Sequence, residues 1–138
     1  MKSNQIEVRS LIALNVKKVW EYYTKPEHIV RWNFAADDWH CPQAENDLRV
    51  GGKYRARMEA KDGSFGFDFT AVYDAVSTGQ SLTYTMEDGR RATADFREQE
   101  GGTLVTVKFD PENENPVEMQ RGGWQAILDN FKKYAEAH

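Results

Sequence analysis

The chain has 138 residues and a mass of 15.9 kDa, which is the size of one domain with its own hydrophobic core. Hydrophobic residues make up 40% of it and charged residues 29%, a balance that excludes intrinsic disorder. Its 18 basic and 22 acidic side chains are interspersed and give a net charge of -4, which excludes the basic surface of a nucleic-acid-binding protein. We therefore expect residues 1–138 to form a single domain that has no nucleic-acid partner.

The predicted elements begin with a strand over residues 5–12, in which Ile6, Val8 and Ile12 share one face. The apolar run that ends this region spans only residues 11–14. It is far too short for a signal-peptide core or for the roughly 20 residues that cross a bilayer. The sequence therefore predicts a cytoplasmic protein without a membrane span.

Two short helices are expected after this strand. Asn15 is a suitable N-cap for a helix over residues 16–24. Pro26 suits the first position of a second helix, over residues 26–32, because its missing N–H would have no partner there. Residues 33–46 show no regular hydrophobic period, so we expect them to form a loop.

Residues 47–109 alternate between apolar and polar side chains, which is typical of antiparallel strands with one buried face. The pairs Asp62-Gly63 and Asp88-Gly89 are strong signals for hairpin turns between such strands. Val72 and Val76 break the alternation, which predicts a β-bulge or a strong local twist. The region therefore reads as a meander of strands joined by short turns.

The C-terminal region predicts one helix of about 22 residues, with Asn115 as its cap, Pro116 at its first position and Glu118 at its third. Two adjacent glycines, Gly122 and Gly123, weaken the helix near its start. We interpret them as sites of close packing against a bulky neighbour, with a hinge or portal as the alternative. One face of the helix carries its apolar residues together with Gln120: Gln120, Trp124, Ile127, Leu128, Phe131, Tyr134 and Ala135.

Motifs for metals, cofactors and nucleophilic catalysis are missing from the sequence. The three histidines, His28, His40 and His138, do not have the spacing of metal ligands. Cys41 is the only cysteine and suits a reducing compartment; we expect it to be structural rather than a nucleophile paired with His40. The sequence thus predicts no cofactor and no metal.

These elements predict a two-layer α+β domain with a curved antiparallel sheet of six or seven strands, a long C-terminal helix and two short helices after the first strand. Six segments, in this order and spacing, carry a resemblance to known proteins: VWEYYTKPEHIVRW (19–32), DLRVGGKYRARM (47–58), FGFDFTAVYDAV (65–76), LTYTMEDGR (82–90), GGTLVTVKF (101–109) and GGWQAILDNFKKY (122–134). The chain resembles the START-like, helix-grip superfamily (SRPBCC), and within it the group related to the C-terminal domain of the activator of the heat-shock protein 90 ATPase. The resemblance implies a sheet wrapped around the C-terminal helix, with a hydrophobic cavity between them.

Aromatic residues make up 12% of the chain, and many of them fall on the inward faces of the predicted strands and helix. Together with the resemblance, this distribution leads us to expect that a small hydrophobic or aromatic molecule binds in the cavity. The residues expected to line it are Trp32, Trp39, Tyr54, Met58, Phe67, Phe69, Tyr84, Met86, Phe96, Trp124, Leu128 and Phe131.

Two other functions remain open, because members of this superfamily differ in what they do. One is an interaction module for a chaperone or stress-response partner. The other is an enzyme that acts in the cavity in the manner of the polyketide cyclases, with His40, Asp37, Asp38 and Tyr84 as the candidate catalytic residues. None of these four has a partner at a recognisable spacing, so we favour a binding protein over an enzyme. A weak homodimer through an edge strand or a helix also stays open.

Overall fold

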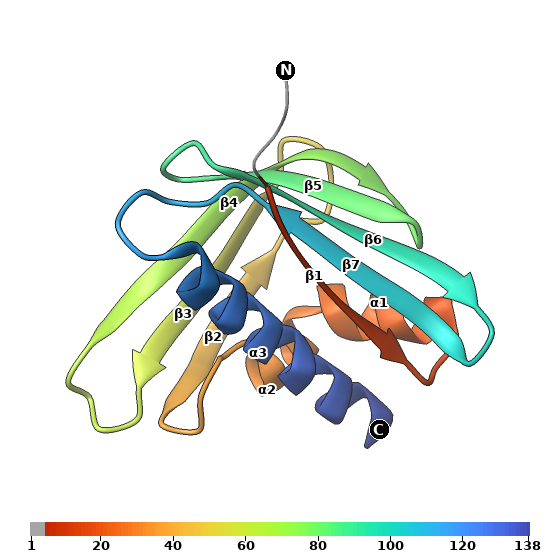
Figure 1. Ribbon diagram of the computed structural model, residues 1–138, viewed down its shortest axis with the longest axis horizontal. Helices are drawn as coiled ribbons and strands as arrows, with labels where there is room; N and C mark the ends of the chain where they lie inside the picture. Colours follow the sequence, from red (N-terminus) through yellow and green to blue (C-terminus); the bar gives the residue numbers. More distant parts are fainter. Residues whose placement is uncertain (1–4) are drawn as a thin grey trace.

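The computed structural model describes residues 5–138, which form a curved antiparallel sheet, one long helix and two short helices (Figure 1). The elements follow the chain in this order: β1 (Ile6–Ile12), α1 (Val16–Thr24), α2 (Pro26–Trp32), β2 (Trp39–Asn46), β3 (Lys53–Ala60), β4 (Gly66–Ser77), β5 (Ser81–Met86), β6 (Arg91–Gln99), β7 (Gly102–Phe109) and α3 (Val117–Glu136).

The seven strands of the described chain form one sheet in the order β1-β7-β6-β5-β4-β3-β2. Every neighbouring pair is antiparallel, and β3 to β7 form the predicted meander, to which β2 adds an edge strand. The segment that contains α1 and α2 carries the chain from one edge of the sheet to the other, so both short helices lie on the concave side (Figure 1). The predicted α+β helix-grip architecture is confirmed.

The irregularity predicted near Val72 and Val76 is a β-bulge in β4. Tyr73 pairs with Tyr84 of β5, but the next pair joins Ala75 to Thr83. Asp74 of β4, which lies between them, therefore has no paired residue in β5. A bulge of this kind bends its strand and increases the local twist. It helps the sheet to curl around α3.

The predicted turn at Asp88-Gly89 is present. Gly89 has a φ of 93°, which residues other than glycine rarely adopt. Gly102 at the start of β7 is more constrained. Its φ is 141°, and a Cβ built there would lie 1.9 Å from the carbonyl oxygen of Ile12. Gly89 therefore allows the turn that the sequence predicted, and Gly102 allows the start of β7 to lie close to the end of β1.

The expectation of a loop over residues 33–46 is wrong for its second half, which forms the edge strand β2. The pairing of β2 with β3 shifts register between His40 and Gln43, around Pro42, which has no N–H to donate. This shift breaks the alternation of apolar residues that marks the other strands. For this reason the strand has no clear period in the sequence.

The two short helices form as predicted. The side chain of Asn15 accepts a hydrogen bond from the Lys18 N–H at 2.9 Å and caps α1, and Pro26 occupies the first turn of α2. Ile29 and Trp32 are buried on the inner face of α2. The indole of Trp32 donates a hydrogen bond to a backbone carbonyl of α1.

Helix α3 begins one residue later than predicted and is capped differently. Its N-cap is Pro116, which has no side-chain hydrogen bond to offer, and it has no capping box with Asn115. The buried side chain of Gln120 organises this end instead. It accepts a hydrogen bond from the Glu112 N–H at 2.9 Å and donates to the Asn115 carbonyl at 2.8 Å. The loop that precedes α3 is thereby fixed to the helix.

Helix α3 lies along the edge strand β1. Gln125 donates a hydrogen bond to the Arg9 carbonyl at 3.1 Å, and the Glu136 carboxylate accepts one from the Ala13 N–H at 2.8 Å.

None of the described helices, within residues 5–138, is long and apolar enough to cross a membrane.

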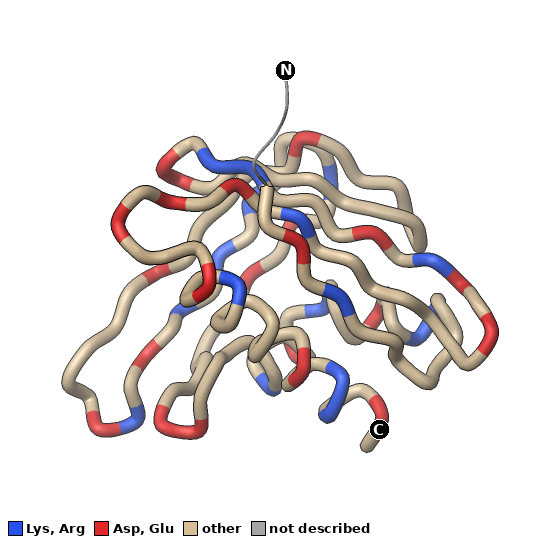
Figure 2. Tube along the Cα trace, viewed as in Figure 1, with Lys and Arg blue, Asp and Glu red and all other residues tan. Residues whose placement is uncertain are grey.

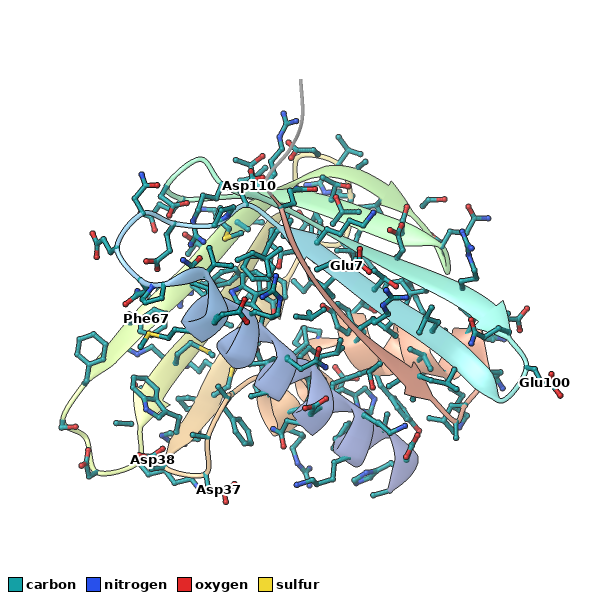
Figure 3. All side chains as sticks on the ribbon, in the orientation of Figure 1. Glu7, Asp37, Asp38, Phe67, Glu100 and Asp110 are labelled. Carbon is teal, nitrogen blue, oxygen red and sulfur yellow. The ribbon has the colours of Figure 1, made fainter. Side chains whose placement is uncertain are left out.

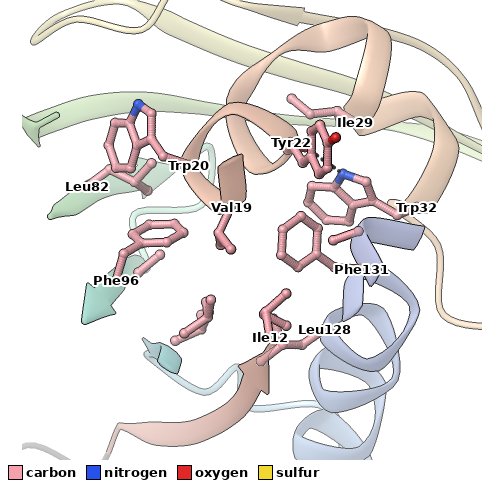
Figure 4. Packing of buried hydrophobic residues seen from close by; sticks show 14 of the residues in the cluster. Ile12, Val19, Trp20, Tyr22, Ile29, Trp32, Leu82, Phe96, Leu128 and Phe131 are labelled. Carbon is pink, nitrogen blue, oxygen red and sulfur yellow. Dashed lines mark hydrogen bonds between the residues drawn. The ribbon is translucent and has the colours of Figure 1, made fainter. Parts of the chain in front are cut away.

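The C-terminal half of α3 packs tightly, and we call this region the packed half; its core residues are Val19, Trp20, Ile29, Phe96 and Phe131. Rings from the short helices fill the space between α3 and the sheet (Figure 4). The Trp20 and Phe96 rings meet edge to face at 5.1 Å between centroids. Phe131, Val19 and Ile29 have no exposed surface.

Candidate functional site

A cavity of about 350 Å³ lies between the concave side of the sheet and the N-terminal half of α3; we call this region the open half. Residues of β1, β3, β4, β5, β7 and all three helices form its walls, together with connecting segments. Most of the lining is apolar or aromatic. The lining residues are Val8, Tyr23, Trp32, Asn33, Tyr54, Met58, Phe67, Phe69, Tyr73, Leu82, Tyr84, Arg90, Val107, Glu112, Trp124, Ile127 and Leu128.

Trp124 holds the first half of α3 against the β1–β7 side of the sheet. Its indole stacks on the ring of Phe109 with 3.9 Å between centroids and 10° between planes. Strands β3, β4 and β5 curve away on the other side, and no short helix is inserted between them and this part of α3 (Figure 1). The gap therefore remains open.

The structure brings together eight of the twelve residues expected to line a cavity: Trp32, Tyr54, Met58, Phe67, Phe69, Tyr84, Trp124 and Leu128. They come from α2, from the three strands β3, β4 and β5, and from α3, and they surround the same space. Trp32 and Leu128 also belong to the core of the packed half, so they form the boundary between the two halves.

The other four expected residues lie elsewhere, and this part of the expectation does not agree with the geometry. Phe96 and Phe131 point toward the concave side, but Tyr23 covers them, with its ring 5.2 Å from each. Met86 packs in a second cluster with Phe109 and other buried residues. Trp39 contacts Phe65 and Phe67 at the end of β2 instead of the cavity.

Nine lining residues were not expected from the sequence: Val8, Tyr23, Asn33, Tyr73, Leu82, Arg90, Val107, Glu112 and Ile127. Six of them lie on the predicted inward faces of strands and helices, so the hydrophobic pattern contained the signal that would have found them. Asn33, Arg90 and Glu112 lie in loops or turns. No periodic pattern identifies residues of that kind.

Four tyrosines, Tyr23, Tyr54, Tyr73 and Tyr84, dominate the cavity wall. The Tyr54 and Tyr84 rings lie parallel, 6.3 Å apart between centroids with 4° between planes, and Tyr73 meets Tyr84 edge to face at 6.2 Å. Asn33 donates a hydrogen bond to the Tyr54 hydroxyl oxygen at 2.9 Å. The inner wall is therefore both aromatic and rich in hydroxyl groups.

The hydroxyl groups of the four tyrosines differ in their partners. The Tyr73 hydroxyl donates to the Asn46 side chain at 2.7 Å, and Asn46 in turn donates to the Thr24 carbonyl. The hydroxyls of Tyr23 and Tyr84 have no hydrogen-bond partner within residues 5–138. Since no side-chain polar atom of the described chain is both fully buried and unpaired, these two hydroxyls keep accessible surface, and both residues line the cavity.

All four tyrosines keep their protons at neutral pH. Burial raises the pKa of Tyr23 to about 12 and raises the pKa values of Tyr54, Tyr73 and Tyr84 above the ordinary value of a phenol. The neighbouring phenols add to this effect, because two negative charges in one apolar cavity would repel each other. At neutral pH the site therefore offers hydrogen-bond donors and no phenolate.

One end of the cavity carries two charged residues, Arg90 and Glu112. The guanidinium of Arg90 contacts the Asp88 carboxylate at 2.8 Å and donates to the Asp110 carbonyl at 3.2 Å. The loop between β7 and α3 is acidic, with Asp110, Glu112 and Glu114, and Figure 2 shows it as the segment with red bands before α3. The lining at this end thus carries one cation, Arg90, and one carboxylate, Glu112, next to an acidic loop.

The family model described as "Activator of Hsp90 ATPase homolog 1-like protein" matches residues 13–136, nearly the whole chain. The chain belongs to this family. It is thereby a member of the START-like superfamily, as its segments suggested. Among proteins with curated descriptions, none matches the chain.

Solved structures support the assignment. An AHSA1-like protein from Aeromonas hydrophila is 42% identical, with a TM-score of 0.92, and the match covers 96% of this chain and 92% of that one. Chr148 from Cytophaga hutchinsonii is 44% identical, with a TM-score of 0.80, over 98% of this chain and 92% of that one. CV1439 from Chromobacterium violaceum shares the fold at 20% identity, with a TM-score of 0.85 over 96% and 97%.

The four candidate catalytic residues do not lie together in the structure. Asp37 and Asp38 lie on the loop before β2, at the lower edge of the molecule in Figure 3, and do not line the cavity. His40 is 3.7 Å from the Glu59 carboxylate, and both side chains are exposed. Only Tyr84 of the four candidates lines the cavity.

Cys41 is buried in β2 and lies outside the cavity lining. Burial raises the pKa of its thiol to about 11, although a hydrogen bond from the Gln43 backbone opposes the shift. The thiol is therefore protonated at neutral pH and a poor nucleophile.

The close-packing interpretation of Gly122 and Gly123 is wrong. A Cβ built at either glycine would meet no atom within 4 Å outside the local helix. Both glycines lie in the part of α3 that passes over the open half, where the helix has fewer neighbours.

Proposed function

We propose that this chain binds a small, mostly apolar molecule in the cavity of the open half. The observation that carries the proposal is the cavity itself: about 350 Å³ of space lined by aromatic and aliphatic side chains, with two hydroxyls that lack a hydrogen-bond partner among residues 5–138. Ligand sites typically combine such an apolar lining with a few polar groups that orient the ligand. The aromatic composition is thereby explained as the lining of a binding site.

Energetics support a ligand. An unfilled cavity in a protein core costs about 2 kcal/mol for each 100 Å³. The same chain fills the packed half completely, with residues such as Phe131 and Val19 that have no exposed surface. A fold that fills one half and leaves the other open would be stabilised by a molecule that occupies the open half.

The test is the binding of diphenylmethane, a two-ring hydrocarbon, to the full chain. We expect it to raise the melting temperature and to quench tryptophan emission, because Trp32 and Trp124 line the cavity. Ile127→Phe puts a ring into the space that the probe would occupy and should weaken both effects. Met119→Phe is the matched control, since Met119 lies on the same helix and is 63% exposed. Binding of diphenylmethane that is as tight in Ile127→Phe as in wild type, or no binding of any apolar probe, would contradict the proposal.

The alternative of a chaperone partner has one supporting observation besides the family's description. Trp39, Phe65 and Phe67 form an aromatic cluster with ring centroids about 6 Å apart, and Phe65 is 60% exposed. If the chain acts on heat-shock protein 90, it should change the ATPase rate of that protein from its own cell, and Phe65→Ser should weaken the effect. An unchanged ATPase rate would rule the alternative out.

Catalysis in the manner of the polyketide cyclases has less support. General acid–base chemistry needs a titratable pair held against the substrate. Tyr84 is the one candidate that lines the cavity, and its raised pKa makes it a donor instead of a base at neutral pH.

A further inference from the structure

The unpartnered hydroxyls of Tyr23 and Tyr84 distinguish the inner part of the cavity from a purely apolar pocket. Tyr54 and Tyr73 line the same space, but the side chains of Asn33 and Asn46 satisfy them. A hydroxyl in an apolar site without a partner loses free energy relative to one in water. A bound ligand that accepts these two hydrogen bonds would recover that loss.

The charges around the cavity indicate that the accepting group is neutral. Arg90 is the one cation among the lining residues of the described chain, and the Asp88 carboxylate and the Asp110 carbonyl already occupy it. Glu112 lies at the same end, on the acidic loop seen in Figure 2. A carboxylate placed among the tyrosines would be an unpaired buried charge, and the acidic end would repel it.

The size of the cavity limits the ligand. Its volume of about 350 Å³ is roughly twice that of a 150 Å³ protein cavity that holds benzene. A molecule of about two rings therefore fits. The walls around the two hydroxyls are aromatic, including the Tyr84 ring and the Phe69 ring, which meet edge to face at 6.1 Å.

We propose, resting on the binding function above, that the ligand is an uncharged two-ring carbonyl compound whose oxygen accepts hydrogen bonds from the hydroxyls of Tyr23 and Tyr84. Tyr84 projects from β5 in the open half. Tyr23 projects from α1 at the boundary with the packed half, where its ring stacks on Trp32 with 5.1 Å between centroids. Packing fixes both rings, so the two donors are preorganised before the ligand arrives.

The test compares benzophenone with diphenylmethane, two probes of nearly equal shape that differ by the carbonyl oxygen. The measured quantity is the ratio of their dissociation constants in wild type, in the double variant Tyr23→Phe/Tyr84→Phe and in Tyr134→Phe. Tyr134 lies outside the cavity and contacts His28. We expect the double variant to reduce the preference for benzophenone about tenfold, and Tyr134→Phe to leave it unchanged.

A second readout separates a hydrogen bond from a change of shape. The carbonyl stretch of bound benzophenone should shift to lower frequency in wild type and return toward its value in an apolar solvent in the double variant. The inference would be overturned if the ratio of the two dissociation constants were the same in all three proteins and the carbonyl stretching frequency did not differ between them. That result would leave the proposed function intact. Tighter binding of diphenylacetate, which carries a carboxylate, would also overturn it. If no probe binds at all, the proposed function itself fails.

Discussion

In the packed half, rings from α1 and α2 occupy the gap between the sheet and α3, whereas in the open half the same kind of gap stays free. Phe131 and Phe69 illustrate the difference. Both are phenylalanines on inward faces. The ring centroid of Phe131 lies 4.9 Å from that of Trp32, and Phe131 has no exposed surface. Phe69, in contrast, lines the cavity. The comparison teaches that an inward-facing ring becomes core or cavity wall according to what lies opposite it.

The largest expected effect comes from truncating a ring in each half. Phe131→Ala should lower the free energy of unfolding by about 3–5 kcal/mol, because it leaves a void in a region that cannot collapse. Phe69→Ala should cost only about 1–2 kcal/mol, because it enlarges a space that is already open. Urea denaturation of both variants measures the difference. Equal losses would show that the two halves are equally well packed.

A pH titration tests whether the four cavity tyrosines are as desolvated as their environment indicates. Their folded-state pKa values are raised above the unfolded value near 10, so this contribution to stability is present below pH 10 and is lost as the pH rises toward the folded-state values. Of the six tyrosines in the chain, we expect these four to ionise together with the loss of far-ultraviolet circular dichroism. Absorbance at about 295 nm follows the ionisation. Ionisation of these four tyrosines near pH 10 in a folded protein would contradict the account.

Adding a ring to each half sharpens the comparison. Val19→Phe should destabilise the chain by about 1–3 kcal/mol, because Val19 has no exposed surface and no space beside it. Ile127→Phe should change the free energy of unfolding by less than about 0.5 kcal/mol, because the cavity accepts the added atoms. Thermal melts in the absence of ligand compare the two. A large loss of stability in Ile127→Phe would mean that the cavity has no room for the phenylalanine ring.

The last comparison concerns the part of α3 over the open half. Gly122→Ala and Gly123→Ala should each stabilise the chain by about 0.5–1 kcal/mol, because alanine favours a helix and the added Cβ meets no neighbour. Gly102→Ala is the contrasting control and should destabilise it, since its Cβ would clash with the Ile12 carbonyl. A loss of stability at Gly122 would mean that the helix is packed more closely there.

The sequence predicted most of the fold because the fold depends on local signals. Alternation in residues 47–109, the Asn15 cap and the Asp88-Gly89 turn each have a physical meaning that holds without tertiary context. The strand β2 was missed because the register shift around Pro42 removes its alternation. The cap of α3 was assigned to Asn115 because the tertiary role of Gln120 cannot be seen in the local pattern.

The cavity was predicted less well, for a different reason. Alternation shows which face of a strand points inward, as for Phe96, but not whether another element covers that side chain. Tyr23 covers Phe96 and Phe131 because α1 folds back beneath the sheet, an arrangement that no single segment encodes. Arg90 and Glu112 come from connecting segments, whose placement depends on the whole fold.

Intermolecular nuclear Overhauser effects between bound diphenylmethane and the protein's methyl groups test most directly whether the open half takes the ligand. We predict contacts to the methyl groups of Met58 and Ile127, which line the cavity, and none to Ile12 and Ile29, which are fully buried in the packed half. Contacts to Ile12 and Ile29, or to the exposed Met119 alone, would contradict the division of the molecule into a packed half and an open, ligand-binding half.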